Sequence, residues 1–423
     1  MVQTNEGTGT IGAPEGGERA VAALEGVTVL DLTAHIAGPY ATKLLADLGA
    51  RVIKIERPGG DPARAFGPWL GDEPGIERSG TYQFLNTNKQ SVVLDLKSAA
   101  GRAVLARLVP LADLVVVGQP PAVAERLHTT PEALREVADV NVLSLTNFGW
   151  TGPYRDYSLS ETVLYAMGGE MFSHGLAGRE PLKLGGTASL IQCGAMAAIA
   201  ALGAVHASEV HGISQRIDVS LFDVQLNSVD RRNSAILAYR FSGRVNSRPE
   251  AAGPAAAAGV AGVFPCADGY LEITASAGAY WRRFVEMLDE PTLREPQWSD
   301  PAWFGTAEAR AQIDAVLYPW LLDRTRLEIW EAARGARAIL APLFTAKDLY
   351  ADAVFRERGL WEQVEHETLG TFPLLGRPYL LSETPWSIRR AAPRLGQDTA
   401  AVLAEAGYDG AAIDDLTRSG AVA

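Results

Sequence analysis

The sequence predicts an α/β fold with a large doubly wound domain around a parallel sheet and a smaller α+β domain in the middle of the chain. Two observations support this prediction. Apolar β-branched runs alternate with segments of helical spacing over residues 26–149, and the character of the chain changes at about residue 225. Strand–helix–strand units are typical of parallel sheets, and 423 residues exceed what one compact core usually needs.

The expected elements follow one another along the chain. A strand over "GVTVLDLTA" (26–34), a helix over 38–50 and a strand over 51–57 form the first unit, and Gly49 is a typical helix end. Further strands and helices are expected at 91–96, 99–112, 113–118, near 131–137, and at 141–149. In a doubly wound sheet, ligands bind at the carboxyl ends of the strands.

The second half of the chain completes both domains. An Ala-rich helix over 193–210 and a strand over 215–221 belong to the large domain, and a helical tail over 390–416 is expected to return to it. The small domain contains a Gly/Ala loop at 251–262 and a strand at 270–275. The predicted leader, first part of the large domain, small domain and returning C-terminal part are 1–22, 23–224, 225–335 and 336–423.

Composition and charge exclude several classes of function. A net charge of −12 disfavours binding to nucleic acid, whose phosphates attract clustered Lys and Arg. The N-terminus lacks the basic and apolar regions of a signal peptide, and no uninterrupted apolar stretch approaches the roughly 20 residues that span a bilayer. Two cysteines are too few for a disulfide framework, which favours a reducing compartment. We therefore expect a cytoplasmic protein without a membrane or nucleic-acid partner.

No metal site is expected, and the cysteines are weighed as nucleophiles. The six histidines lack H-E-x-x-H spacing, and no C-x-x-C, G-x-S-x-G or Walker A motif occurs. Cys193, at the entry to the Ala-rich helix, is a candidate because a helix N-terminus lowers the pKa of a thiol. Its neighbours Gly194 and Ala195 supply no base, so we interpret Cys193 as a buried structural residue. Cys266 receives the same interpretation.

A charged turn follows the strand at 51–57. The segment "IKIERPGGDPAR" places Glu56, Arg57 and Arg64 at the carboxyl edge, where an Arg fork could bind a phosphate. A solvated loop accounts for the same residues equally well. The polar residues around the next strand, including Lys97, suit a nucleotide-like ligand or an ordinary loop.

Seven segments in register carry a resemblance to a known family. They are "GVTVLDLTAHIAGPYATKLLADLGARVIKIERPGGDPAR", "NTNKQSVVLDLK", "LADLVVV", "NFGWTGPY", "QRIDVSLFD", "FPCADGYLEI" and "APRLGQDTAAVLAEAGY". From about residue 24 to its C-terminus, the chain resembles the family III CoA-transferases, which are related to formyl-CoA transferase, carnitine CoA-transferase and α-methylacyl-CoA racemase. The resemblance implies an interlocked dimer with a Rossmann-like large domain.

The resemblance also implies substrates and site residues. In the transferases an Asp carboxylate attacks an acyl-CoA thioester, forms a mixed anhydride, takes CoA as an enzyme-bound thioester and passes it to an incoming carboxylic acid. Coenzyme A is then substrate and carrier, and no metal is needed. The implied CoA contacts are His35, Ile36, Ala37, Arg57, Leu94 to Lys97, and Arg126.

The chain departs from this family at the nucleophile. Counting back from Gly194, the family Asp falls on Leu190, and no Asp or Glu occurs in 181–208. Glu161 lies at a commonly acidic position that borders the active site, but the His that the racemases need just before it is Ser160. Neither standard mechanism is complete in this chain.

Four hypotheses therefore stay open. In the first, the chain is the Asp-less subunit of a heteromeric CoA-transferase, such as those acting on benzylsuccinate-type aromatic dicarboxylates, and a sequence-related partner carries the Asp. In the second, a homodimer acts on acyl-CoA with Glu161 as general acid or base. In the third, the chain binds CoA without catalysis. In the fourth, it is an ordinary homomeric transferase whose nucleophile is not at position 190.

Overall fold

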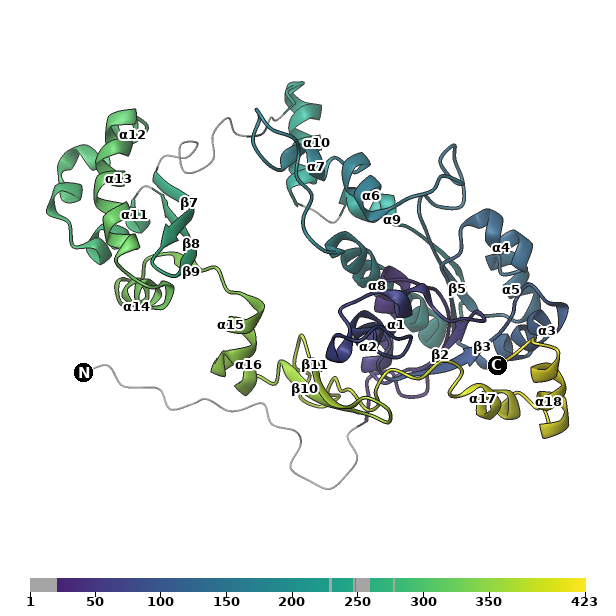
Figure 1. The fold of residues 1–423 in the computed structure, drawn as a ribbon. Helices are drawn as coiled ribbons and strands as arrows, with labels where there is room; N and C mark the ends of the chain where they lie inside the picture. Colours follow the sequence, from purple (N-terminus) through teal and green to yellow (C-terminus); the bar gives the residue numbers. More distant parts are fainter. Residues whose placement is uncertain (1–20, 228–229, 246–247, 249–258, 277) are drawn as a thin grey trace. The chain divides into compact units, whose positions relative to one another are not determined.

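The chain forms two compact units in the computed structural model. The structure describes residues 21–227, 230–245, 248, 259–276 and 278–423 (Figure 1). The large unit comprises Met1–Met171, Lys183–Arg244 and Glu357–Ala423, and the small unit comprises Phe172–Leu182 and Val245–Arg356. Most of the expected leader, and residues 251–258 of the expected Gly/Ala loop, lie outside the described residues.

The boundaries of the small unit differ from those of the small domain that the sequence predicts at 225–335. Helices α9 (Leu221–Asn227) and α10 (Asp230–Ser242) belong to the large unit. Leu221 and Val224 explain this for α9, because both pack in the same core cluster as the sheet.

The large unit is built on a parallel sheet of six strands with the order β3-β2-β1-β4-β5-β6. Its central pairings place Leu30 beside both Ile53 and Val115. The direction of winding reverses between β1 and β4, which is the switch point where doubly wound folds bind ligands. The strands are β1 (Thr28–Leu32), β2 (Arg51–Glu56), β3 (Lys89–Val93), β4 (Leu114–Val117), β5 (Asn141–Thr146) and β6 (Arg216–Ser220).

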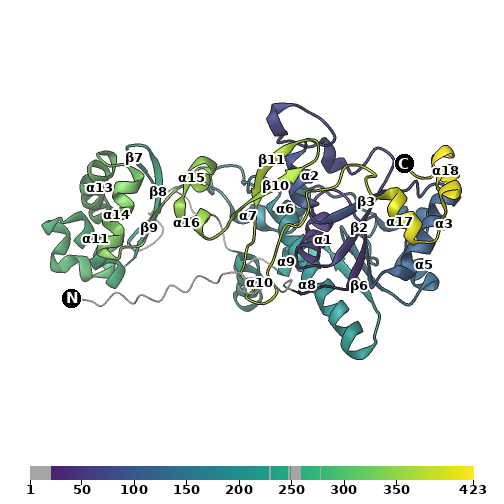
Figure 2. The same ribbon diagram turned by 90° about the horizontal axis from the view of Figure 1, so that it is seen from below.

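Both faces of the sheet are covered, which explains why apolar residues of its strands point to either side. Val29 packs with helices α1 (Ala37–Asp47) and α8 (Ala188–His211) on one face. Its neighbour Leu30 packs with α3 (Ala99–Leu108) and α17 (Thr399–Glu405) on the other face. Figure 2 shows the C-terminal helices beside α3, as the expected return of the tail to the large domain requires.

The remaining elements of the large unit surround this sheet. The helix expected over 99–112 ends as an α-helix at Leu108, because Pro110 lacks the N–H that would continue it. A hairpin of β10 (Trp361–His366) and β11 (Gly370–Leu375) precedes the tail. The other helices of this unit are α2 (Gly80–Leu85), α4 (Pro121–Leu127), α5 (Pro131–Val137), α6 (Glu161–Met167) and α18 (Gly410–Arg418), and the short α7 (Glu170–Ser173) lies at its boundary. Short 3-10 helices cover Pro62–Ala65, Leu70–Asp72 and Val109–Leu111.

Helix α8 is longer than the sequence indicated, since it begins five residues before Cys193. By length and composition it is apolar enough to cross a membrane, in contrast to the expectation that no such stretch exists. Ala197, Ala201 and Val205 are buried against the core of the large unit. The apolar character of α8 is therefore that of a core helix.

The small unit has its own core. Three antiparallel strands, β7 (Gly259–Cys266), β8 (Gly269–Ser276) and β9 (Leu340–Pro342), pack against helices. The ring of Trp281 contacts the ring of Phe304 edge to face, with centroids 4.7 Å apart. The centroid of the Trp298 ring lies 5.4 Å from that of Trp281. Its helices are α11 (Ala279–Leu288), α12 (Pro301–Phe304), α13 (Ala307–Leu322), α14 (Arg326–Ala336) and α15 (Ala346–Ala351), with 3-10 helices at Pro291–Arg294 and Pro296–Ser299, and α16 (Ala353–Glu357) leads out of it.

Candidate active site

The switch point of the sheet holds two loops in close contact. Thr33 follows β1, and Gly118 follows β4. A Cβ added at Gly118 would lie 3.1 Å from the Cβ of Thr33, so only glycine allows this approach without displacement. The side chain of Gln119 donates a hydrogen bond of 3.0 Å to the carbonyl of Leu32. These contacts fix the start of the 33–37 segment at the carboxyl edge.

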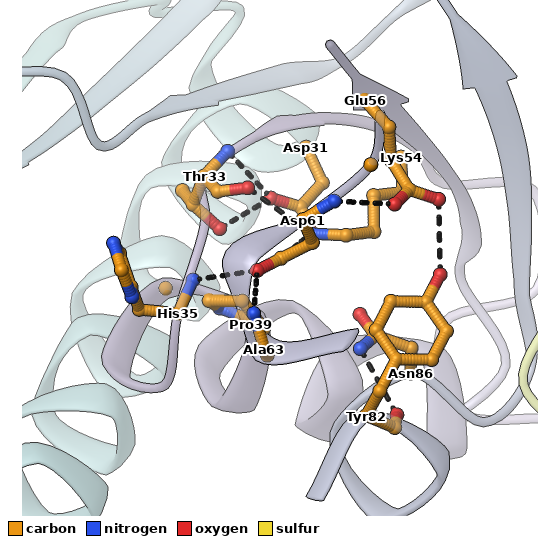
Figure 3. A network of polar contacts seen from close by, with 12 residues as sticks. Asp31, Thr33, His35, Pro39, Lys54, Glu56, Asp61, Ala63, Tyr82 and Asn86 are labelled. Atoms are coloured by element: carbon orange, nitrogen blue, oxygen red, sulfur yellow. Dashed lines mark hydrogen bonds and ion pairs between the residues drawn. The ribbon is translucent and has the colours of Figure 1, made fainter. Parts of the chain in front are cut away.

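A buried ionic network lies under this segment (Figure 3). The Nζ of Lys54, on β2, lies 2.8 Å from Oδ2 of Asp61 and 4.0 Å from Oδ2 of Asp31, and donates to the carbonyl of Thr33 at 3.0 Å. Asp31 in turn accepts hydrogen bonds from the backbone N–H and hydroxyl of Thr33. One buried cation thus connects β1, β2 and both loops that follow them.

Asp61 also fixes the backbone of His35. Its Oδ1 accepts hydrogen bonds from the N–H groups of His35 at 3.0 Å and of Ala63 at 2.8 Å (Figure 3). His35 has a φ of +68°, a left-handed conformation that costs free energy in a non-glycine residue and that the bond to Asp61 stabilises. The His35 ring is exposed and stacks near Phe66, with centroids 6.2 Å apart.

The charges in this network are strongly coupled. Burial by itself would raise the pKa of the Asp31 carboxyl, but Lys89 and Lys54 hold that pKa below its usual range. Burial would lower the pKa of Lys54, but Asp61 and Asp31 raise it above its usual range. Lys89 differs, because burial lowers its pKa to about 8 even though Asp31 opposes the change. Asp31 and Lys54 are therefore ionised at neutral pH.

Glu56 and Arg64 form a second buried pair beside the first. The guanidinium of Arg64 donates to both carboxylate oxygens of Glu56 at 2.8 Å and also to the hydroxyl of Tyr82. Burial would raise the pKa of Glu56, but the hydrogen bonds and charge of Arg64 lower it to about 2. Arg64 is 1% exposed, so its fork binds a carboxylate inside the protein and does not reach a phosphate.

Three exposed cations follow strands β2, β3 and β4 along the chain. Arg57 follows β2, is exposed, and donates from Nε to the carbonyl of Gly60 at 3.1 Å. Lys97 follows β3 and is exposed, as is Arg126 in the last turn of α4. Because β3, β2, β1 and β4 are consecutive in the sheet, these side chains come from two loops and one helix that follow nearby strands.

The other predicted contacts of CoA lie in the backbone framework of the same edge. Ile36 and Ala37 are 8% and 7% exposed at the start of α1, and Leu94 is 1% exposed after β3. The side chain of Leu94 packs in the core, so only its backbone borders the edge. Among the residues that the structure describes, no group of three His, Cys, Asp or Glu side chains suited to a metal occurs.

The start of helix α8 is apolar. Leu190, in its first turn, is partly buried and packs against the core cluster of the large unit. Thr187 precedes the helix and makes no side-chain capping bond. Gly194 lies against α1, where an added Cβ would be 2.4 Å from the carbonyl oxygen of Ala37. This close packing holds the first turn of α8 beside the 33–37 segment.

The cysteines are structural, as the sequence indicated. Cys193 is completely buried, and its Sγ lies 3.6 Å from the carbonyl of Leu221. Burial raises the pKa of its thiol to about 12, so almost no thiolate exists at neutral pH. Cys266 is also buried in the small unit, and burial raises the pKa of that thiol as well. Neither thiol is suited to act as a nucleophile.

Glu161 begins helix α6 and is engaged in an ion pair. Its Oε2 lies 2.5 Å from Nζ of Lys183, and only 12% of the Glu161 side chain is exposed. The same Nζ donates to the carbonyls of Leu184 and Gly186, so Lys183 is held in place by three acceptors. A Glu161 carboxylate in this pair is positioned, and its Oε2 must leave Lys183 before that oxygen could accept a proton as a general base.

The sequence did not identify Lys54 and Asp61, which organise the loop at 33–37. Lys54 lies inside an apolar strand, and a lone Lys in such a run is the signal that could have found it, because buried Lys needs a carboxylate partner. Asp61 appears in the sequence as one more polar residue of a Gly-rich turn. Its bond to His35 spans 26 residues of sequence, so spacing gave no indication of that role.

A sequence comparison decides the family. The pattern that defines CoA-transferase family III matches residues 24–399. The chain belongs to CoA-transferase family III. A relative at 31% identity, over 93% of this chain and 97% of its own length, is the succinyl-CoA:(R)-benzylsuccinate CoA-transferase subunit BbsE of Thauera aromatica. The succinate–glutarate CoA-transferase of Agrobacterium fabrum is 30% identical, over 90% of this chain and 95% of its own length.

Two solved structures share this fold. A CaiB/BaiF family protein from Brucella suis aligns with a TM-score of 0.79 at 26% identity, over 91% of this chain and 99% of its own. A protein from Mycobacterium tuberculosis aligns with a TM-score of 0.74 at 23% identity, over 90% of this chain and 99% of its own. The family thus accounts for the α/β architecture, and its chemistry acts on CoA thioesters and carboxylates.

Proposed function

We propose that this chain is the subunit without the nucleophilic carboxylate in a heteromeric CoA-transferase. The observation that supports the proposal is Leu190, an apolar residue that packs on the core at the position where the resemblance implies an Asp. No Asp or Glu occurs in 181–208, so no neighbouring acid on α8 could replace it. The carboxylates of Asp31, Glu56 and Asp61 at the same edge are buried in ion pairs.

In this proposal the partner chain performs the covalent steps. Its Asp carboxylate attacks the acyl-CoA carbonyl and releases CoA thiolate, which leaves a mixed anhydride. The thiolate then attacks the aspartyl carbonyl, gives an aspartyl-CoA thioester and releases the first carboxylic acid. The incoming acid repeats the sequence in reverse. Each thioester bond broken is matched by one formed, so neither ATP nor an oxidant is required.

This chain would contribute a site for coenzyme A and an ordered scaffold. Arg57 and Lys97 are exposed cations on the loops after β2 and β3, and Arg126 is exposed in the last turn of α4. We assign all three to the phosphates and adenine of CoA. The 33–37 segment would hold the thiol end, because Asp61 fixes the backbone of His35. The family resemblance implies that the two chains interlock as a dimer. The two buried cysteines, neither in a disulfide, agree with a reducing cytoplasmic compartment.

The relatives support a division of labour between chains. The benzylsuccinate relative is named as a subunit, and it matches this chain over nearly its full length. The alternative is a homodimer in which Glu161 is the general acid or base. Its support is the location of Glu161 at the start of α6, but the ion pair with Lys183 occupies the carboxylate.

Co-expression with a family III paralogue encoded beside this chain tests the proposal. We expect a heteromer that transfers CoA from succinyl-CoA to an added carboxylic acid, whereas this chain alone shows no transfer. A CoA adduct detected by mass spectrometry should lie on the paralogue. Transfer at a normal rate by this chain alone would contradict the proposal.

Two variants separate the alternatives. Glu161→Gln in this chain should leave the heteromer active, whereas the homodimer alternative predicts that turnover is abolished. Leu190→Asp should allow this chain to form a CoA adduct of its own, and Leu190→Asn is the matched control because it is equally polar and cannot form a mixed anhydride. An adduct on the Leu190→Asn chain would show that the reactive residue is not at position 190.

A further inference from the structure

A cleft of about 680 Å³ opens beside the 33–37 segment in the large unit. Four aromatic residues line it, namely Trp69, Phe84, Trp361 and Phe372. None of the described residues that line it is charged. The sequence gave no indication of this cleft, because its walls come from the segment at 68–71, from α2, from α8 and from the β10–β11 hairpin.

The cleft lies next to the proposed reaction centre. Ile36, a predicted contact of CoA, forms part of its wall. Thr187 and Ile191 form another part, and these residues flank Leu190 along the first turn of α8. A group that extends from a thioester held at the 33–37 segment toward the start of α8 would therefore enter this cleft.

The aromatic walls are held by the surrounding structure. Phe84 stacks near Tyr40 with centroids 6.2 Å apart, and Nζ of the buried Lys43 lies 5.2 Å from the Phe84 ring. Phe372 is 7% exposed on β11, where its backbone pairs with Val364 of β10. A cleft whose walls are already ordered loses little conformational entropy when a ligand binds.

We infer that this cleft binds an aromatic acyl group carried on coenzyme A. Its rings offer apolar faces and edges that pair with an aryl ring. The absence of a cation among its described lining residues means that a second free carboxylate would lose its hydration without compensation. The cleft therefore favours an aryl acyl group and disfavours a short dicarboxylic one. This inference rests on the proposed CoA site.

Binding measurements with the full-length purified chain test the inference. Quenching of tryptophan fluorescence and calorimetry would follow free CoA, succinyl-CoA and benzoyl-CoA. We expect benzoyl-CoA to bind at least about tenfold more tightly than succinyl-CoA, because burial of its ring removes apolar surface from water. If CoA and both thioesters fail to bind, the proposed CoA site is wrong. If CoA binds and benzoyl-CoA binds no more tightly than succinyl-CoA, only the aromatic cleft is wrong.

Variants at Trp69 locate the effect in the cleft. Trp69→Ala should weaken benzoyl-CoA binding by about tenfold and leave binding of free CoA within twofold, whereas Trp69→Phe should retain most of the preference. Trp330→Ala is the matched control, because Trp330 is likewise half-buried but lies in the small unit. Circular dichroism would establish that each variant is folded. An equal loss of CoA and benzoyl-CoA binding in Trp69→Ala would contradict the assignment.

Discussion

Two regions meet at the carboxyl edge of the sheet, and they differ in charge. On the β1–β2 side, Asp31, Lys54 and Asp61 are all buried and connected by ion pairs. On the α8 side, Leu190 and Cys193 are apolar or neutral, and the helix approaches α1 through glycine. The chain has therefore kept a demanding ionic framework around the proposed CoA loop while the neighbouring helix start carries no acid.

The difference in charge indicates what each of the two regions contributes. Buried charges are costly unless they are paired, so a sequence keeps such a network only where every member is satisfied. A network that fixes the backbone of His35 has a purpose when the 33–37 segment binds a ligand. The α8 region needs no charge if its contribution is packing and shape. This difference agrees with the proposal that the chain holds a CoA ester beside a nucleophile supplied by another chain.

The largest expected effect follows from removal of the central cation. Lys54→Met should lower the free energy of unfolding by about 3–5 kcal/mol, because it leaves the buried Asp61 carboxylate without its cation. Arg51→Met on the same strand is the control, since the pair between Arg51 and Glu405 is exposed and contributes at most about 1 kcal/mol. Urea unfolding measures both. Equal losses of unfolding free energy in the two variants would show that the buried network contributes no more to stability than the exposed pair.

Low pH should selectively reduce the stability that comes from the buried charges on the β1–β2 side. The folded pKa of Glu56, about 2, lies below its ordinary value of 4.5, so its stabilisation is complete above pH 4.5 and is lost as the pH falls toward 2. The contribution is on the order of 3 kcal/mol. Urea midpoints at pH 6, 4 and 3 should therefore converge for wild type and Glu56→Gln. The exposed Glu405→Gln variant should show little difference from wild type at any of these pH values.

On the α8 side, the free energy of unfolding should depend on side-chain volume and hardly on charge. Gly194→Ala places a methyl group 2.4 Å from the carbonyl oxygen of Ala37 and should cost about 1–3 kcal/mol of unfolding free energy. Gly203→Ala on the same helix has nothing within 4 Å and should stabilise by about 0.5–1 kcal/mol through helix propensity. Thermal unfolding distinguishes the two. A stabilising Gly194→Ala would mean that α1 and α8 are not in close contact.

The smallest effect concerns the chemical reactivity of Cys193. It is measured on the unmodified chain, so no contact in the structure changes. With a thiol pKa of about 12 and complete burial, its alkylation by iodoacetamide at pH 8 should be at least about 100-fold slower in the folded protein than in urea. Mass spectrometry of the labelled peptide gives both rates. Rapid labelling of the folded chain would instead identify a reactive thiolate on the α8 side.

The sequence predicted the parallel sheet well because each strand can be identified from its own residues. Each includes β-branched or other apolar residues between turn or helix signals, as strands buried on both faces require. The start of α8 was missed by five residues, since the Thr, Ala and Ser before Cys193 carry no apolar period. Family register drew attention to Leu190, and the structure adds that this side chain packs on the core.

By itself the sequence determined the family, the alternation of strands and helices, and the absence of an acid from 181–208. Only the tertiary structure decided which charges are available. Arg57 and Arg64 lie in one short segment, yet Arg57 is exposed whereas Arg64 binds Glu56 in the interior. It also decided that Asp61 holds His35 and that four aromatic rings from distant segments share one cleft. Burial and pairing depend on contacts between residues far apart in the chain, which local spacing does not encode.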